Sequence, residues 1–234
     1  MSNQIVNGDG TPLFMDVLYG GFQDVAGNPL LFSKDVLVQE LPDTKAPNIL
    51  GGTEDYSNGL HYENGSLTII CDETIDVTPG EYVNTSKIYL ADVSGDRRLL
   101  LHGAQIIGVD DVIVTLLLTE LQRVSAIAAS NTSGGDGNSV VLDVYAGAVR
   151  DLAGNLNIGN GGLGRPVTEF PDFVPPNIES AQLNYNFGYL TIKVDETTNP
   201  TPGNLTNLNK FTIGNDANSA SHSNLAGATI IEKD

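Results

Sequence analysis

Hydrophobic and polar residues alternate with a period of two along much of the chain, which is typical of strands that bury one face. The clearest case is the alternation of Leu67, Ile69 and Cys71 with Thr68 and Ile70. Between turns rich in Gly, Asp and Asn, the same reasoning predicts strands over five further segments: Lys87–Ala91, Leu99–Leu101, Ala104–Ile107, Val112–Leu118 and Val140–Tyr145. The pattern therefore predicts an all-β protein made of short strands.

One segment departs from this period. Residues 119–129, TELQRVSAIAA, carry apolar side chains at positions 121, 124, 127 and 128, and Thr119 stands where a helix N-cap is expected. We expect a short helix or turn that crosses from one sheet to another. Short strands with one such crossover favour an antiparallel β-sandwich.

The chain also repeats itself. The motif DVLYGGFQDVAGN at 16–28 returns as DVYAGAVRDLAGN at 143–155, 127 residues later (143 − 16). The strand segment SLTIICDET at 66–74 matches YLTIKVDET at 189–197, 123 residues later (189 − 66). Self-similarity at such spacing indicates a tandem array. In this alignment Cys71 takes the position of Val194, so it is predicted to be a small core hydrophobe rather than a nucleophile.

A linker containing proline precedes each of these strands, with DTKAPNI at 43–49 and DFVPPNI at 172–178. The alignment divides the chain into three parts: the C-terminal part of one repeat (1–42), a complete repeat (43–172) and the N-terminal part of a third (173–234). We expect a fragment of a longer array, because half-repeats expose their cores. The alternative is a subunit whose ends complete each other head to tail. The counterpart of roughly Asp111 to Ile127 is missing from both ends, which argues against that alternative.

Composition excludes several classes of function. With 11 Lys and Arg against 29 Asp and Glu, the net charge is −18, which disfavours binding to nucleic acid or to anionic membranes. No apolar run approaches the ~20 residues of a membrane helix, so no membrane insertion is expected. A single cysteine rules out an intrachain disulfide framework.

Catalytic and cofactor motifs are not visible either. Residues 159–164 fit G-x-G-x-x-G, but Arg165 and Pro166 follow where a dinucleotide site needs a helix, so we expect a loop and no organic cofactor. No G-x-S-x-G or Ser/His/Asp arrangement is found, and the chain is predicted not to be an enzyme.

Four motifs in order carry a resemblance to a known class: the DxxxPxI linker, the LTIxxDET strand, the LTELQR turn and the closing AGAVxDLAGN. Together they resemble the tandem Ig-like or cadherin-like repeats of large prokaryotic (archaeal or bacterial) and viral surface proteins of the S-layer and adhesin type. The resemblance implies tandem Ig-like antiparallel β-sandwiches, each with one short helical crossover. It also implies an extracellular location, on a cell or virion surface.

Such repeats imply an architectural function: a segment of a surface layer, filament, sheath or adhesin stalk. The implied partners are neighbouring repeats and copies of the chain itself in a polymer or lattice. The alternative is a receptor- or glycan-binding module of a phage or virus fibre or an adhesin. The only segment that favours this alternative is Thr53 to Glu63, which contains Tyr56, His61 and Tyr62. With no tryptophan and 6% aromatic residues, the chain is poor in platforms for sugar rings.

Acidic residues supply the one candidate site. In a sandwich, loops two connections apart lie at the same pole. The loop after the strand of Leu67 to Cys71 should carry Asp72 and Glu73, and the loop between the last two strands should carry Asp151 and Asn155. Both loops should meet the entering linker. The expected oxygen ligands are Asp43, Asn48, Asp72, Glu73, Asp151 and Asn155. Ca²⁺ binds six to eight such oxygens, and an ion here would stiffen the junction. The alternative is that Asp-x-x-Gly-Asn is an ordinary turn and that Asp72 and Glu73 simply end a strand.

Overall fold

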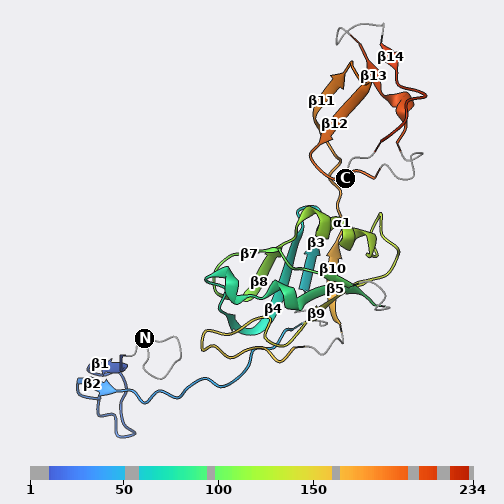
Figure 1. Ribbon diagram of the computed structural model, residues 1–234. Coiled ribbons are helices and arrows are strands. Elements are labelled where there is room, and N and C mark those ends of the chain that lie inside the picture. Colours follow the sequence, from blue (N-terminus) through green and yellow to red (C-terminus); the bar gives the residue numbers. More distant parts are fainter. Residues whose placement is uncertain are drawn as a thin grey trace. The chain divides into compact units, whose positions relative to one another are not determined.

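An antiparallel hairpin opens the part of the chain that the computed structural model describes, which comprises residues 11–50, 58–93, 98–159, 164–199, 206–214 and 222–231. Strand β1 (Phe14–Val17) pairs with β2 (Ser33–Leu37), with Met15 opposite Val36 (Figure 1). Asp35 has φ 52°, and its amide donates to Asp16 Oδ1 at 2.8 Å. By its contacts the chain divides into two units, Met1–Phe173 and Val174–Asp234.

Eight strands form one continuous curled sheet in the first unit, in the order β6-β5-β9-β10-β3-β4-β8-β7 (Figure 1). Neighbouring strands are antiparallel except β10 and β3, whose parallel pairing joins the two halves of the sheet. The strand bounds are Asn58–His61 (β3), Ser66–Ile75 (β4), Ile88–Asp92 (β5), Arg98–Leu100 (β6), Gln105–Ile107 (β7), Asp111–Leu117 (β8), Val140–Val144 (β9) and Arg165–Phe170 (β10).

An all-β protein was predicted, and the structure is mostly β. The five predicted strands are confirmed, each with bounds within one residue of those expected. The alternation in β4 also holds, because Leu67, Ile69 and Cys71 are buried while Thr68 and Ile70 are half-exposed. Burial raises the pKa of the Cys71 thiol to about 12, so it remains protonated at neutral pH and behaves as a core hydrophobe.

The core lies between the two halves of the curled sheet. Its largest fully buried side chains are Tyr62, Leu60, Leu67, Ile69, Ile75, Ile88, Leu101, Leu116 and Leu142. They come from both halves of the sheet, so removal of this apolar surface from water adds to the strand pairing in holding the halves together.

The predicted crossover is helix α1 (Glu120–Ala128), which connects β8 in one half of the sheet to β9 in the other. Thr119 and Gln122 form a reciprocal capping box at its start, as the sequence predicted for the cap. The expected apolar face is wrong in part, since Leu121 is exposed and Arg123 is buried. The buried guanidinium is compensated by the carboxylates of Glu120 at 2.8 Å and Asp172 at 3.0 Å.

The described residues of the second unit form two antiparallel strand pairs. Strand β11 (Ile178–Asn184) pairs with β12 (Tyr189–Val194), and β13 (Thr212–Ile213) pairs with β14 (Ser223–Asn224). Leu190, Ile192 and Val194 alternate with exposed neighbours, like their counterparts in β4, but they are only half-buried. No helix among the described residues has the length and apolar character needed to cross a membrane.

Candidate cation site

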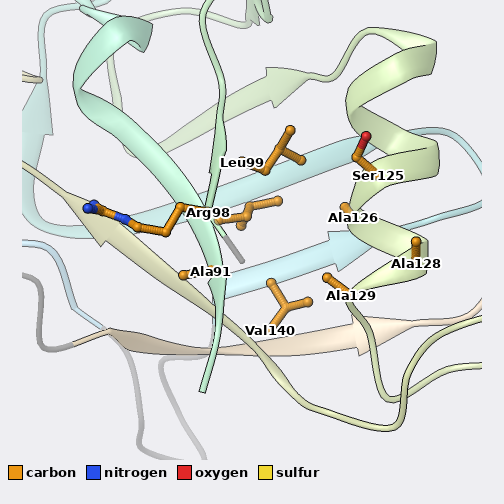
Figure 2. Close-up of a pocket in the computed structure, with 9 residues that line it drawn as sticks. Ala91, Arg98, Leu99, Ser125, Ala126, Ala128, Ala129 and Val140 are labelled. Carbon is orange, nitrogen blue, oxygen red and sulfur yellow. The ribbon is translucent and has the colours of Figure 1, made fainter. Parts of the chain in front are cut away.

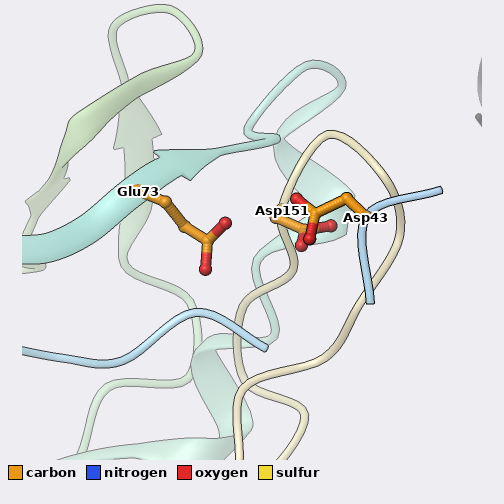
Figure 3. Close-up of side chains that lie close together, drawn as sticks. All are labelled: Asp43, Glu73 and Asp151. Carbon is orange, nitrogen blue, oxygen red and sulfur yellow. The ribbon is translucent and has the colours of Figure 1, made fainter. Parts of the chain in front are cut away.

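Three carboxylates from separate segments converge beside the linker that enters the sheet (Figure 3). Asp43 lies in that linker, Glu73 lies in β4, and Asp151 follows β9. One oxygen of each lies within 4.8 Å of an oxygen of the other two. The convergence that the sequence predicted is therefore present for these three residues.

Asp151 is placed by its own turn. Its Oδ1 accepts from the Asn155 amide at 2.8 Å and its Oδ2 accepts from Asn155 Nδ2, also at 2.8 Å. Gly154 takes φ 90°, which closes the turn with a bond from its amide to the Asp151 carbonyl. Asn155 Nδ2 also donates to the Asp43 carbonyl at 3.2 Å, so the turn is tied to the linker. Asp151 is only 2% exposed.

Glu73 is the least satisfied member. Its Oε1 is buried and has no hydrogen-bond partner among the described residues. The nearest cation is Lys45 Nζ, 3.7 Å away, which is beyond hydrogen-bond distance. Burial raises the pKa of Glu73, and the negative charges of Asp151, Asp43 and Asp72 raise it further against the opposing effect of Lys45. A divalent cation between the three carboxylates would offset both the cost of burying the Glu73 charge and the repulsion among the carboxylates.

Asp72 is used differently from the prediction. Strand β4 continues to Ile75, so the expectation that Asp72 and Glu73 lie in the loop after the strand is wrong. The linker runs beside β4, where the Asp72 amide donates to the Asn48 carbonyl at 3.1 Å, and farther along the strand Ile75 pairs with Asp111 of β8. Asp72 accepts in return from the Asn48 amide at 2.8 Å and from Asn48 Nδ2 at 3.1 Å, and Lys45 Nζ donates to it at 2.7 Å.

These bonds decide the charge of Asp72. Burial alone would raise the pKa of the carboxyl group, but the hydrogen bonds from Asn48 and Lys45 outweigh burial and lower the pKa to about 2. Asp72 and Asn48 therefore hold the linker on the sheet. Asn155 orients Asp151. Of the six predicted ligands, three converge and three position the site. Lys45 was not among the predicted residues, although its place two residues after Asp43 in the linker was a signal.

A separate hollow of about 360 Å³ lies between α1 and strands β5, β6 and β9 (Figure 2). It is lined by Leu90, Ala91, Arg98, Leu99, Ser125, Ala126, Ala128, Ala129 and Val140. Its two polar side chains are engaged elsewhere, because Arg98 donates to the Tyr145 hydroxyl and Ser125 donates to the Leu121 carbonyl. The lining supplies no acid–base pair, and the neighbouring residues 94–97 lie outside the described part of the chain.

The remaining residues that the sequence suggested for ligand or cofactor binding lie away from the cation site or outside the described residues. Tyr56 lies outside the described residues, while Tyr62 is buried and the His61 ring stacks on Phe170 at 4.1 Å between centroids. Two of the three aromatic residues considered for ligand binding thus pack within the protein. Residues 160–163 of the glycine-rich segment also lie outside the description, and strand β10 follows them rather than a helix.

Comparisons of the chain with protein-family models, with curated proteins and with solved structures found no match.

Proposed function

We propose that this chain is an architectural segment of an extracellular repeat protein, built of tandem Ig-like units. It would form part of a surface layer, filament, sheath or adhesin stalk. The acidic cluster of Asp43, Glu73 and Asp151 binds Ca²⁺ and stiffens the junction where the linker meets the sheet. The observation that carries the proposal is a set of hydrogen bonds that occurs twice, at the spacing of the sequence repeat.

The first member of this set is the Asp-x-x-Gly-Asn turn. Asp24 accepts from the Asn28 amide and from Asn28 Nδ2 at 2.9 Å each, as Asp151 does from Asn155 at 2.8 Å. Gly27 has φ 86°, close to the 90° of its counterpart Gly154. The same turn thus occurs at two places 127 residues apart. This supports the view that each turn lies at the end of an equivalent unit.

The second member is the clamp between the linker and the following strand. The Asn177 amide donates to Asp195 Oδ1 at 2.7 Å and Asn177 Nδ2 to Oδ2 at 3.0 Å, as Asn48 does to Asp72. The Asp195 amide donates to the Asn177 carbonyl at 3.1 Å, the same length as in the Asp72–Asn48 pair. This recurrence supports a repeated unit whose linker is held in one way.

The strand order supports an Ig-like unit. The Ig fold has two sheets. The counterparts of β4, β8 and β7 lie in one sheet, and the counterparts of β10, β9, β5 and β6 lie in the other. The parallel β3–β10 pair then joins the two sheets along one side, which accounts for the continuous hydrogen bonding of the eight strands. The crossover α1 passes between the two sheets in this reading.

Calcium is favoured over other ions by the donor chemistry. All three convergent side chains are carboxylates, and the cluster contains no histidine or cysteine. Hard oxygen donors select Ca²⁺ or Mg²⁺ over Zn²⁺ or copper, and Ca²⁺ tolerates the irregular geometry of ligands drawn from a linker, a strand and a turn. The buried Glu73 Oε1 without a hydrogen bond is the atom that most needs such a partner.

The test is thermal unfolding of the whole chain with and without Ca²⁺. A ligand at a hundred times its Kd adds about 2.7 kcal/mol to the stability of the folded state, so the midpoint should rise by several degrees. Glu73→Gln should abolish the rise. Glu196→Gln is the matched control, since Glu196 is the counterpart of Glu73 in the sequence repeat (196 − 73 = 123) and lies in the second unit, and it should retain the rise. An unchanged midpoint in saturating Ca²⁺ rules out the cation and leaves the architectural proposal standing.

A further inference from the structure

The outer side of one half of the eight-stranded sheet is formed by side chains that carry no charge. Strands β4, β8 and β7 lie side by side in this half (Figure 1). Along β4 as far as Cys71, and along β8 from Ile113, every second side chain is buried, so the side chains between them point outward. Together with one residue of β7 they form the uncharged face, which consists of Thr68, Ile70, Ile107, Ile113, Thr115 and Leu117.

The strand pairing sets these side chains in rows. Ile70 lies opposite Ile113, Thr68 opposite Thr115, and Thr115 opposite Ile107. Ile107 and Ile113 are each 44% exposed, and the two threonines and Ile70 are half-exposed. Paired β-branched side chains pack closely on a pleated sheet. The uncharged face therefore presents methyl groups and hydroxyl groups, with no carboxylate or ammonium group among them.

The other half of the sheet has a charged outer side. There the Arg98 guanidinium lies 4.7 Å from the centre of the Tyr89 ring and 5.4 Å from that of Tyr145, and it is 3.6 Å from Asp143 Oδ2. Tyr89 and Asp143 lie opposite each other in the β5–β9 pair. The two rings are thus occupied by a cation of the protein itself. The lack of charge distinguishes one side of the sheet from the other.

Both edges of the sheet are obstructed, although a free strand edge is the usual place for a strand of another chain to add. At β6, Gln122 of α1 donates through Nε2 to the Leu100 carbonyl at 3.1 Å and to the His102 carbonyl at 2.9 Å. At β7, the 3₁₀ helix η1 (Gly80–Tyr82) lies against the strand. A contact between copies of this sheet therefore has more room on a face than at an edge.

We propose that the uncharged face is a lateral contact between two copies of the chain, packed sheet on sheet. The net charge of −18 makes two copies repel each other, and the repulsion is least where both surfaces lack carboxylates. The face is also self-complementary, because apolar side chains pack on one another and a hydroxyl group both donates and accepts. The inference rests on the proposed function, in which copies of the chain are partners, and it involves only β4, β7 and β8.

The size of the face makes this contact weak. Strands about 4.8 Å apart, with rows about 7 Å apart, give the face an area on the order of 300 Å². A stable complex buries about 800 Å² on each partner, so two copies should associate only at concentrations on the order of 0.1–1 mM. In a filament or layer many such contacts act together, which would hold neighbouring chains side by side.

Sedimentation of the whole chain tests the contact, in a chelator so that Ca²⁺ cannot bridge the acidic copies. The average mass should rise with protein concentration, and added NaCl should strengthen the association by screening the repulsion between copies. Ile113→Lys should weaken the association more than about tenfold, because it would bury an unpaired ammonium group. Leu100→Lys is the matched control. Leu100 is 39% exposed on the outer side of the other half, and this variant makes the same change in net charge, so it should retain the association.

Methyl NMR spectra of the isoleucines locate the contact. The signals of Ile70, Ile107 and Ile113 should shift as the concentration rises, whereas that of Ile158, which is 75% exposed elsewhere, should not. Shifts confined to Ile178 would place the association in the second unit and overturn the proposal.

Three further results would also overturn it: a constant mass up to about 1 mM, association that weakens with NaCl, or equal association of Ile113→Lys and the parent chain. A constant mass would leave the face to a different partner or to none. The calcium-dependent midpoint is measured separately, so the proposed function and this contact can fail independently.

Discussion

Asn48 and Asp72 are joined by three hydrogen bonds, two from Asn48 to the carboxylate and one from the Asp72 amide to the Asn48 carbonyl. The pair connects the entering linker to β4, next to the bridge between Ile49 and Cys71. Both side-chain bonds have a charged acceptor, which makes them stronger than bonds between neutral groups. The pair therefore fixes the direction in which the linker enters the sheet.

Asn48→Ala should lower the free energy of unfolding of the eight-stranded sheet by about 1.5–3 kcal/mol, because it removes a bond to a charged acceptor and leaves a partly buried carboxylate less well compensated. Urea unfolding followed by tyrosine fluorescence measures the loss. Asn177→Ala, in the equivalent pair of the second unit, is the control and should leave that transition unchanged. Equal stability of Asn48→Ala and the parent chain would contradict the prediction.

The same pair makes stability depend on pH. The pKa of Asp72 is about 2 in the folded protein, below the ordinary value of 3.8, so the unfolded chain takes up a proton first as the pH falls. Asp72 therefore contributes its full stabilisation above about pH 5, and this contribution is lost between about pH 5 and pH 2. Thermal midpoints across this range should fall less steeply for Asp72→Asn than for the parent chain. Parallel curves would show that the carboxylate is not the titrating group.

Glu73 should behave in the opposite direction. Its folded pKa is raised, first by burial and then by the neighbouring carboxylates, so its ionised form destabilises the folded state at neutral pH. Without a cation, Glu73→Gln should raise the thermal midpoint at pH 7, and the gain should shrink as the pH falls and Glu73 becomes protonated. The measurement is a set of melts in a chelator. A thermal midpoint at pH 7 that is lower for Glu73→Gln than for the parent chain would contradict this prediction.

Arg123 offers a prediction about the crossover helix. Its guanidinium is buried and donates to the carboxylates of Glu120 and Asp172 and to the Tyr62 carbonyl at 3.0 Å. Arg123→Ala leaves these acceptors without their donor and should cost about 3–5 kcal/mol. Arg123→Lys keeps the positive charge but cannot form the forked contact with two carboxylates. Its unfolding free energy should therefore lie between those of the parent chain and of Arg123→Ala. Leu121→Ala, at an exposed position of the same helix, should change the unfolding free energy by less than about 0.5 kcal/mol.

Local patterns predicted most of the fold, since alternation placed the strands and the capping residues placed α1. They failed where a residue is controlled by a distant partner. Arg123 could not be assigned to the core without knowing that Asp172, 49 positions later, lies beside it. Likewise β4 runs past Cys71 because the linker pairs with it at Cys71 and Asp72 and because Ile75 pairs with Asp111 of β8, whereas Asp72 looked like a strand end when viewed alone.

The candidate site shows the same division. The sequence indicated that the linker, the strand and the turn meet, and Asp43, Glu73 and Asp151 do meet. It did not predict which of the six side chains point at one another, because that depends on side-chain direction. The amide of Asn48 takes Asp72 out of the cluster, and the buried Oε1 of Glu73 remains in it.

The Asn155 side chain bonds to the carbonyl of Asp43 as well as to Asp151. Under tension, a pull on the linker reaches this bond and the Lys45–Asp72 ion pair before it reaches the Asn48–Asp72 pair and the strands behind it. The linker would therefore release in stages, lengthening by a few residues while the buried sheet stays intact. A load applied through the linker would then lengthen the chain before it disturbed the core of the eight-stranded sheet.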